Sequence, residues 1–406
     1  MQRVKALDEL APVDLWREVP QIEDEFWYDM QEKQRGLLKV VLEGALEEEM
    51  TLLLGAARFR RTESRSDYRN GFYSRDLVTQ IGVVTGMRVP RARGGPVERS
   101  VFSRYRRRQA QVDHVIREVF LAGVSTRRVG ETLTALLGEP VSAQTVSRVA
   151  RSLDREVERF HRLPLADDVL YLFLDGVYLR MKGVLAQRPG LAGARRRLVL
   201  CAYGITETGE RRLLDFRLAL SESAAHWEAF LSQLRERGLF GQSLKLVVTD
   251  GCAGLHAALD IVYPYVPRQL CWVHKLRNVC NYLKKSQMEE CMAGARAIYQ
   301  AQTRRVAVQA FWAWAKRWRA EATKAVACLE RDLQTLLAFL ACPVAHHKKV
   351  RTTNVIERCF REVRRRTRPM TCFNNDASCE RIIYAVFSHL NRKWEGKPLP
   401  QFTHNS

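Results

Sequence analysis

Two acidic residues lie within or directly after apolar runs that have the composition of buried strands. Asp175 lies in the middle of VLYLFLDGVYLR (169–180), and Asp250 precedes the last residue of LKLVVTDG (244–251). A carboxylate in such a place needs a proton, hydrogen bonds or a cation, because an unpaired buried charge is very costly. If the two strands are neighbours in one sheet, the carboxylates meet at one edge and can share a proton or bind a divalent cation.

Glu357 is the best candidate for a third acid. It lies near the start of a helix predicted over 352–366. Three carboxylates would offer the hard oxygen ligands that Mg²⁺ and Mn²⁺ prefer. Two other interpretations stay open, because Asp-Gly is common turn chemistry and Asn354 as an N-cap would place Glu357 in a capping box. The apolar stripe beside Glu357 consists of Val355, Ile356, Cys359, Phe360 and Val363.

The chain is strongly basic although its composition is otherwise that of a globular protein. Its 406 residues include 66 Lys and Arg against 45 Asp and Glu, which gives a net charge of +21. This balance favours a polyanionic partner, and nucleic acid is the commonest one. Arginine predominates in the basic clusters, which favours bidentate phosphate contacts. The alternative is a basic surface that keeps the protein soluble.

The densest basic cluster lies in a stretch with turn signals, RNG (69–71) and RGG (93–95), and short β-like pieces around LVTQIGVV and MRVPRA. We interpret this stretch as a basic arm or hairpin that follows a phosphate backbone, with a solvated linker as the alternative. Glu98 is the single acid between 88 and 108. The arginines of this segment are Arg88, Arg91, Arg93, Arg99, Arg104, Arg106, Arg107 and Arg108.

The segment 111–155 predicts three short helices, with Ser125 and Ser142 placed to cap the second and third. The third helix would present polar side chains near its start, as a helix-turn-helix recognition helix does in the major groove. A plain three-helix packing module is the alternative. The candidate DNA-contacting residues of this segment are Arg127, Arg128, Gln144, Thr145, Ser147 and Arg148.

From residue 169 onward the pattern predicts a mixed sheet of the α/β class, into which a helical block is inserted late. Because the strands precede and then alternate with helices, the first and fourth can be neighbours. The predicted strands cover 169–180, 195–206, 211–220, 244–251 and 268–274, and the predicted helices cover 223–238, most of 275–345, 352–366 and 382–394.

A Cys-x-x-His pair, Cys271 and His274, encloses Trp272. As a zinc site the pair is half complete, because no second pair follows at finger spacing. The ten cysteines fall singly, which favours a reducing compartment. We expect Phe311, Trp314 and Trp318 to form the core of the helical block, with Trp272 and Trp312 as weaker candidates for contacts to unpaired DNA.

The order Asp, Asp and then Glu after a helical insertion resembles that of DDE transposases with a ribonuclease-H-like core, and more narrowly of bacterial Mutator-type insertion-sequence transposases. The intervals agree, with 250 − 175 = 75 residues and 357 − 250 = 107 residues. Members usually carry Asn-Arg shortly after the catalytic Glu, whereas Cys359-Phe360 precede Arg361 here. The matching motifs are SDYRNGFYSR (66–75), RVPRAR (88–93), GVSTRRV (123–129), VSAQTVSR (141–148), LFLDGVYL, VVTDG, QLCWVHKLRNV (269–279), TTNVIER (352–358) and RRRTR (364–368).

The resemblance implies that Asp175, Asp250 and Glu357 are catalytic and hold two Mg²⁺ or Mn²⁺ ions per active site. It implies binding to double-stranded DNA at transposon ends and target, cleavage and strand transfer through a circular intermediate, and a homodimer. The Cys271/Trp272/His274 motif would be structural or DNA-facing. A nuclease or resolvase on the same core, or a DNA-binding regulator that no longer cuts, is the alternative. The phosphate-holding residues would be Arg364, Arg365 and Arg366.

The organisation expected from these patterns is a mainly helical DNA-binding N-terminal region followed by a catalytic core. Because no signal-peptide core or membrane-length apolar run is present, we expect a cytoplasmic, nucleoid-associated protein with no membrane partner. The predicted parts are a helical region (1–60), the basic arm (61–110), a helix-turn-helix domain (111–160), the first part of the core (165–274), an all-α insertion (275–345), and the last core helices with the tail (346–406).

Overall fold

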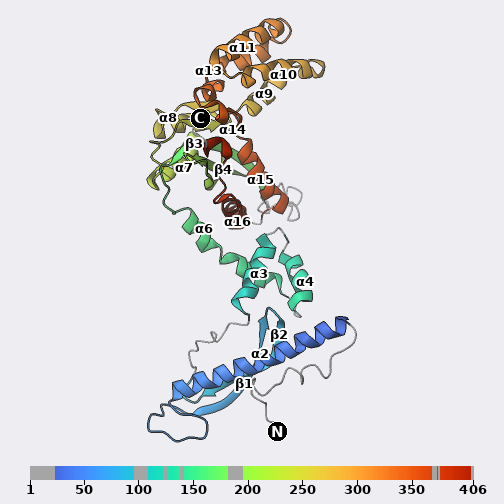
Figure 1. Ribbon diagram of the computed structural model, residues 1–406, viewed down its shortest axis with the longest axis vertical. Coiled ribbons are helices and arrows are strands. Elements are labelled where there is room, and N and C mark those ends of the chain that lie inside the picture. Colours follow the sequence, from blue (N-terminus) through green and yellow to red (C-terminus); the bar gives the residue numbers. More distant parts are fainter. Residues whose placement is uncertain are drawn as a thin grey trace, which may run out of the picture. The chain divides into compact units, whose positions relative to one another are not determined.

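The computed structural model describes residues 23–95, 108–121, 124, 126–137, 141–181, 195–367, 373 and 375–403 (Figure 1). The chain divides into two units, Met1–Arg151 and Ser152–Ser406. The described helices lack any segment long and apolar enough to span a bilayer.

The described part of the first unit contains a long helix, α2 (Glu23–Leu54), packed on the antiparallel hairpin of β1 (Arg69–Thr79) and β2 (Gly82–Ala92). Leu46 of α2 is fully buried against apolar side chains of both strands. The hairpin predicted for the arm is therefore present, but its turn joins Thr79 to Gly82. The RNG turn predicted at 69–71 is wrong, because this segment lies inside β1, where the strand register shifts between Arg69 and Phe72.

Three helices follow as predicted: α3 (Ala110–Leu121), α4 (Thr126–Leu137) and α5 (Ala143–Arg151). The Ser142 hydroxyl accepts a hydrogen bond from the Thr145 amide at 3.2 Å, so it caps α5. Ser125 lies outside the described residues. A Cβ at Gly130 would lie 2.2 Å from the Val141 carbonyl oxygen, so glycine is needed where α4 approaches the chain before α5. The buried residues of this group include Val112, Ile116, Phe120, Val129, Leu133 and Val146.

The second unit contains a five-stranded mixed sheet, which confirms the α/β class. The strand order is β5-β4-β3-β6-β7, in which β3, β4 and β5 are antiparallel and β6 and β7 run parallel to β3. The strand predicted over 268–274 is too long, because β7 ends at Leu270 and a helix begins at Trp272. The strands are β3 (Val169–Met181), β4 (Arg195–Thr206), β5 (Arg211–Ala219), β6 (Leu246–Thr249) and β7 (Arg268–Leu270).

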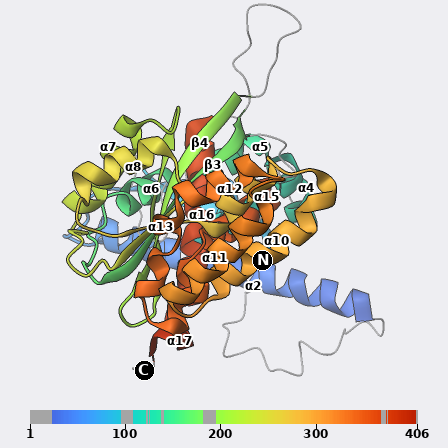
Figure 2. The same ribbon diagram turned by 90° about the horizontal axis from the view of Figure 1, so that it is seen from above.

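Helices cover both faces of this sheet (Figure 2). Alternate residues of β3 point to opposite faces, and Leu172 and Leu174 pack with Trp227 in the core beneath α7 (Ala224–Glu236) and α8 (Ala253–Val262). On the other face, α15 (Asn354–Thr367) contacts β3 and α16 (Asp376–Trp394) contacts β5. Asp175 differs from Leu172 by an odd number of positions, so it faces α15.

A helical block connects β7 to α15, as predicted. Phe311, Trp314 and Trp318 are buried in it, and the Trp314 indole donates a hydrogen bond to the Cys291 carbonyl at 3.0 Å. Shorter elements of the unit are α6 (Asp154–Phe160), η2 (Ala338–Ala341), η3 (Val344–His346), α14 (His347–Val350) and α17 (Pro400–Thr403). The helices of the block are α9 (Trp272–Cys280), α10 (Lys285–Gln300), α11 (Arg304–Trp318), α12 (Thr323–Arg331) and α13 (Leu333–Leu336).

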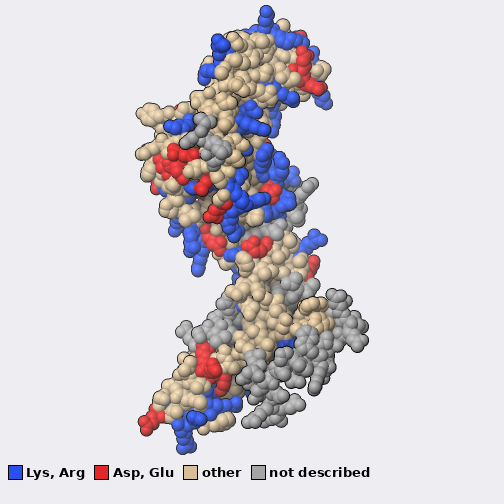
Figure 3. Space-filling view, in the orientation of Figure 1, with Lys and Arg blue, Asp and Glu red and all other residues tan. Residues whose placement is uncertain are grey.

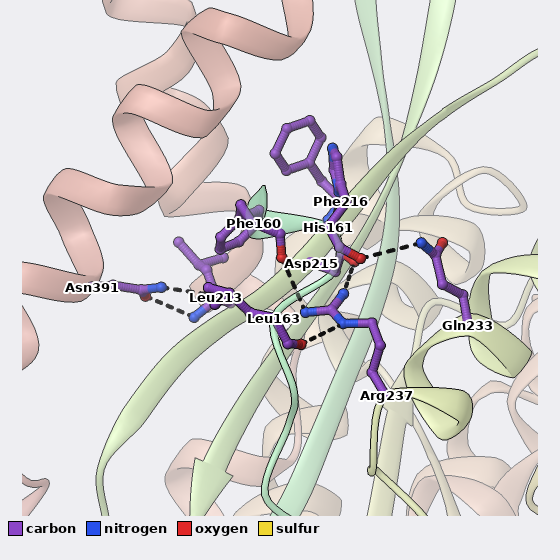
Figure 4. A network of polar contacts seen from close by, with 9 residues as sticks. All are labelled: Phe160, His161, Leu163, Leu213, Asp215, Phe216, Gln233, Arg237 and Asn391. Atoms are coloured by element: carbon purple, nitrogen blue, oxygen red, sulfur yellow. Dashed lines mark hydrogen bonds and ion pairs between the residues drawn. The ribbon is translucent and has the colours of Figure 1, made fainter. Parts of the chain in front are cut away.

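A buried ion-pair network fixes the end of α7 to β5 (Figure 4). Asp215 of β5 is fully buried and pairs with Arg237, which follows α7. His161 Nδ1 lies 2.6 Å from the same carboxylate. The Arg237 guanidinium also donates to the carbonyls of Leu163 at 2.7 Å and Phe160 at 3.2 Å. The network thus satisfies the buried charge of Asp215.

We expect Arg237→Met to destabilise the second unit by about 3 kcal/mol, because it removes the main partner of the buried Asp215 carboxylate. Urea unfolding followed by tryptophan fluorescence measures the loss. Arg217→Met is the control, since Arg217 lies exposed on β5, the strand that carries Asp215. Equal stability of the two variants would contradict a structural role for the network.

Candidate active site

The sheet brings the two strand acids side by side. β3 and β6 run parallel, and their last paired residues are Phe173 and Val248. Two residues further along lie Asp175, still within β3, and Asp250, directly after the end of β6, so the parallel register places the acids at equivalent positions. Gly251 adopts a φ of +94°, which turns the chain into α8. The neighbouring strands expected from the sequence are therefore confirmed.

The glycine after Asp175 has a steric reason. A Cβ at Gly176 would lie 2.8 Å from a carboxylate oxygen of Glu222 and 3.1 Å from a methyl carbon of Leu198. Gly176 is an even number of positions from Leu174, so Glu222 packs over β3 on the α7/α8 side, opposite the Asp175 side chain. Burial, and then the charge of Asp250, raise the pKa of Glu222. This fourth carboxylate could not be singled out from the sequence, because a Glu between two serines in a loop carries no distinguishing pattern.

Burial and the neighbouring acids strongly affect the pKa of Asp175. It is only 4% exposed, and its pKa is raised to about 7, first by burial and then by the negative charge of Asp250. His274 and a hydrogen bond from Thr353 oppose the shift, while Glu357 adds to it. Such a site concentrates negative charge where solvent cannot screen it, so a proton or another cation is strongly favoured there.

Glu357 lies in the first turn of α15 and its carboxylate is directed towards α9. One oxygen lies 3.5 Å from His274 Nε2 and 3.9 Å from Arg277 Nη2. The helix begins at Asn354 itself, so Asn354 is the first helical residue and the capping-box interpretation is not supported. No sequence pattern marks Arg277, because its part in the site depends on how α9 packs against α15.

The Cys-x-x-His pair ties α9 to the start of α15. Cys271 is buried, and its sulfur accepts a hydrogen bond from the Thr353 amide at 3.3 Å. Burial alone would raise the pKa of Cys271, but hydrogen bonds from His274 and Thr353 outweigh it and lower the pKa. The Cys271 hydrogen bond in turn raises the pKa of His274 to about 9. The pair thus holds a cationic imidazolium beside Glu357.

Trp272 does not face solvent, so its candidacy for contacting unpaired DNA is wrong. It is 1% exposed, and its indole N–H donates to the Leu336 carbonyl at 2.8 Å. Of the two roles left open for the Cys271/Trp272/His274 motif, these positions favour the structural one. Trp312 of α11 is 54% exposed and stays a candidate.

We expect His274 to keep its proton up to about pH 9 in the wild type and to lose it at a lower pH in Cys271→Ala. The hydrogen bond to Cys271 is the largest contribution to its raised pKa, so removal should lower that pKa by about one unit or more. A titration of ¹³C-labelled imidazole groups by NMR measures both values. An unchanged titration in Cys271→Ala would contradict the coupling.

The three acidic side chains are chemically suited to a divalent cation, although their arrangement does not surround a single site. Asp175, Asp250 and Glu357 offer hard carboxylate oxygens, and a cation would relieve the repulsion that raises the pKa of Asp175. Within the described parts of the chain, no group of three or more His, Cys, Asp or Glu side chains is set to hold a metal. Glu357 would have to turn from His274 and Arg277 to join the two aspartates.

The candidate DNA-contacting residues of the first unit are mostly exposed. Arg91 and Arg93 lie exposed near the end of β2, and Arg91 stacks on the Tyr73 ring at 5.1 Å. On α5 the apolar side is buried, so the remaining candidates lie on its outer side or on α4. Arg106 and Arg107 lie outside the described residues, and of Arg127 only its place in α4 is described. The residues on these helices are Arg128, Gln144, Ser147 and Arg148.

Arg364, Arg365 and Arg366 form the last turn of α15, two turns beyond Glu357. Arg365 and Arg366 lie 3.2 Å and 3.7 Å from Glu362, so part of their charge is balanced within the helix. Figure 3 shows Lys and Arg side chains gathered on the second unit around this helix. The structure thus places this run on the same helix as the third acid, within a basic surface.

The chain matches the family model described as "Transposase, Mutator family" over residues 15–397. It is 34% identical to the transposase for insertion sequence element ISRM5 of Rhizobium meliloti (strain 1021), over 89% of this chain and 88% of the relative. It is also 34% identical to the transposase for insertion sequence element IS406 of Burkholderia multivorans (strain ATCC 17616 / 249), over 88% and 90%. The Drosophila P element transposase strand transfer complex aligns with 77% of this chain and 83% of its own at 11% identity, with a TM-score of 0.31, too low to establish a shared fold.

Proposed function

The chain belongs to the Mutator family of transposases, and from this membership we propose that it moves its insertion sequence by metal-dependent DNA cleavage and strand transfer at Asp175, Asp250 and Glu357. The observation that carries the proposal is that Asp175 and Asp250 lie together at the end of one buried strand pair, where burial and then the charge of Asp250 raise the pKa of Asp175 to about 7. Perturbed carboxyl groups of this kind are typical of functional sites.

The strand order supports a ribonuclease-H-like catalytic core. Three antiparallel strands are followed by two strands parallel to the first, and the first strand, β3, lies at the centre of the sheet. Asp175 lies on this central strand, Asp250 follows its parallel neighbour, and Glu357 comes from a helix on one face. The helical block between β7 and α15 then corresponds to the all-α insertion of the DDE transposases that the sequence resembles.

In the proposed chemistry, two Mg²⁺ or Mn²⁺ ions would, when bound, supply positive charge for activation of the attacking oxygen and stabilisation of the leaving one. Asp175, Asp250 and Glu357 would hold them. A water molecule attacks a phosphodiester at the element end, the bond from phosphorus to the 3′ oxygen breaks, and a 3′-OH is released. That hydroxyl then attacks a phosphodiester of the target. Its 3′ oxygen bonds to the target phosphorus, the bond from that phosphorus to the target's own 3′ oxygen breaks, and a target 3′-OH leaves. The chain needs no Ser, Tyr or Cys nucleophile for either step.

In this proposal His274 and Arg277 neutralise the charge of Glu357 when no divalent cation is bound. Cys271 keeps His274 protonated. The α3–α5 helices and the basic hairpin would bind the terminal inverted repeats, and Arg364, Arg365 and Arg366 would hold nearby phosphates. Because two ends must be joined, we propose that a homodimer acts on the DNA, in the cytoplasm and at the nucleoid.

The test is to incubate the purified protein with Mg²⁺ and linear DNA that ends in the element's terminal repeats, and then to separate the products. Cut ends joined to a second DNA molecule are the expected result. Cut ends that are never joined would identify a nuclease or resolvase instead. Tight binding with no cut at any Mg²⁺ or Mn²⁺ concentration would identify a regulator and would contradict the proposal.

A further inference from the structure

A pocket of 530 Å³ lies on the α15 side of the sheet and is lined by several cations. Phe173 of β3 and Tyr203 of β4 form part of its floor, and α9 and α15 contribute walls. Among the described residues that line it there is no carboxylate. Its cationic residues are Arg211, Lys348, Lys349, Arg351 and Arg358.

The positive charges of this pocket are not balanced by acids. Within the described part of the chain, Lys348, Lys349 and Arg358 form no ion pair. Burial, followed by the charges of Arg211, Arg358 and Lys348, lowers the pKa of Lys349. Arg351 is fixed in place, because it donates to the Tyr299 carbonyl at 2.8 Å and stacks on that ring at 4.9 Å. Like charges held together without a counter-charge favour an anionic ligand.

The pocket adjoins the acids. Phe173 precedes Asp175 by two residues on the same face of β3, a separation of about 7 Å along the strand. On α15, Asn354 and Arg358 line the pocket, while Glu357 between them is directed towards His274. In B-form DNA about 7 Å of helix axis covers roughly two nucleotides of one strand. A DNA strand that runs along β3 with one phosphate at the acids would bring its neighbouring phosphates to the pocket.

The aromatic residues of the pocket are buried or have their rings covered. Tyr299 is partly exposed, but Arg351 stacks on its ring at 4.9 Å and Trp272 packs against it at 5.2 Å. Phe173, Tyr203 and Trp272 are each 1% exposed, and the rings of Phe173 and Tyr203 pack edge-to-face with each other at 5.4 Å. The accessible groups are instead the ammonium and guanidinium ends. The lining is thus suited to phosphate oxygens and not to a stacked base.

We propose that this pocket binds backbone phosphates of the DNA strand next to the phosphodiester held at the acids. The inference rests on the proposed function, since it assumes that DNA occupies the acid site. Lys349 and Arg358 would supply the flexible contacts, and Arg351 would contribute a fixed positive charge.

The test compares Lys349→Gln/Arg358→Gln with the control Lys316→Gln/Arg305→Gln. Both double variants remove two cations of the second unit, and the control residues are exposed on α11. Binding of a fluorescein-labelled duplex is measured by anisotropy without divalent cations over a range of KCl concentrations. The pocket variant should bind roughly tenfold more weakly at about 0.1 M salt, with a slope of log K against log salt shallower by about 2. The slope of log K against log salt should be steeper for the control variant than for the pocket variant.

The same titration separates the possible failures. Equal slopes in the pocket and control variants, with tight wild-type binding, would overturn the phosphate pocket and leave the proposed function standing. A wild-type protein that does not bind DNA at all would refute the proposed function and with it this inference. A parallel titration with tripolyphosphate distinguishes the source of the phosphate. Loss of tripolyphosphate binding alone, with DNA binding unchanged, would assign the pocket to a small phosphorylated molecule and overturn the proposal.

Discussion

Glu357→Gln should slow Mg²⁺-dependent DNA cleavage by at least about 10³-fold, because it removes one of the three carboxylates that would hold the divalent cations at the reacting phosphate. The substitution keeps the size of the side chain and removes only its charge. Asp175→Asn and Asp250→Asn should have effects of the same order, since the three acids act as one unit. The measurement is the single-turnover rate of cleavage of DNA ending in the terminal repeats.

Glu236→Gln is the matched control for this series, because Glu236 lies exposed at the end of α7. It should cleave at the wild-type rate. All of the variants should bind DNA as wild type does, since the acids do not contribute to attraction of the phosphate backbone. A Glu357→Gln protein that cuts as fast as Glu236→Gln would show that the third acid is not Glu357.

Asp175→Asn should stabilise the protein at neutral and alkaline pH while it abolishes cutting. The Asp175 pKa is raised from 3.8 to about 7 by burial and by Asp250. The folded state therefore binds the proton more tightly than the unfolded state, so folding stability falls as pH rises from about 4 to about 7 and stays low above that range. A shift of this size corresponds to about 4 kcal/mol. Asn carries no charge and escapes this penalty.

Urea unfolding of the wild type and Asp175→Asn at several pH values tests this expectation. The advantage of the variant should grow by roughly 2–3 kcal/mol between about pH 5 and pH 8. Addition of Mg²⁺ at pH 8 should stabilise the wild type and leave the variant nearly unchanged, because bound cations would offset the same repulsion. A stability difference between the two proteins that does not change with pH would mean that folding does not raise the pKa of Asp175.

Asp175 and Asp250 could be singled out because each stands out in a local pattern. Apolar runs of strand length predict buried strands, and an acid within one run and at the end of another is visible without knowledge of the fold. That the two strands are neighbours depends on long-range pairing, which the sequence allowed but did not determine. The extent of the last strand was not predictable in the same way. Cys271 and Trp272 continue the apolar character of β7, and periodicity alone does not distinguish a short buried strand from the buried first turn of a helix. Tertiary packing decides that the helix begins at Trp272.

The contacts that complete the site were beyond the sequence for a different reason. Arg277 and Glu357 meet because the helical block returns the chain to the sheet, and no local pattern sets that distance. The cationic pocket likewise draws Arg211 from β5 and Arg358 from α15. The RNG segment was misassigned because glycine with φ of +66° at Gly71 occurs in turns and also at an irregularity within a strand.

Counting bound Mn²⁺ by electron paramagnetic resonance tests the central claim most directly. The three acids should form one site for divalent cations, so wild type and Glu236→Gln, with DNA ending in the terminal repeats, should each bind two Mn²⁺ ions per active site. Asp250→Asn should lose them. Equal Mn²⁺ binding by Asp250→Asn and the wild type, or none by either, would contradict a metal-dependent catalytic site at Asp175, Asp250 and Glu357.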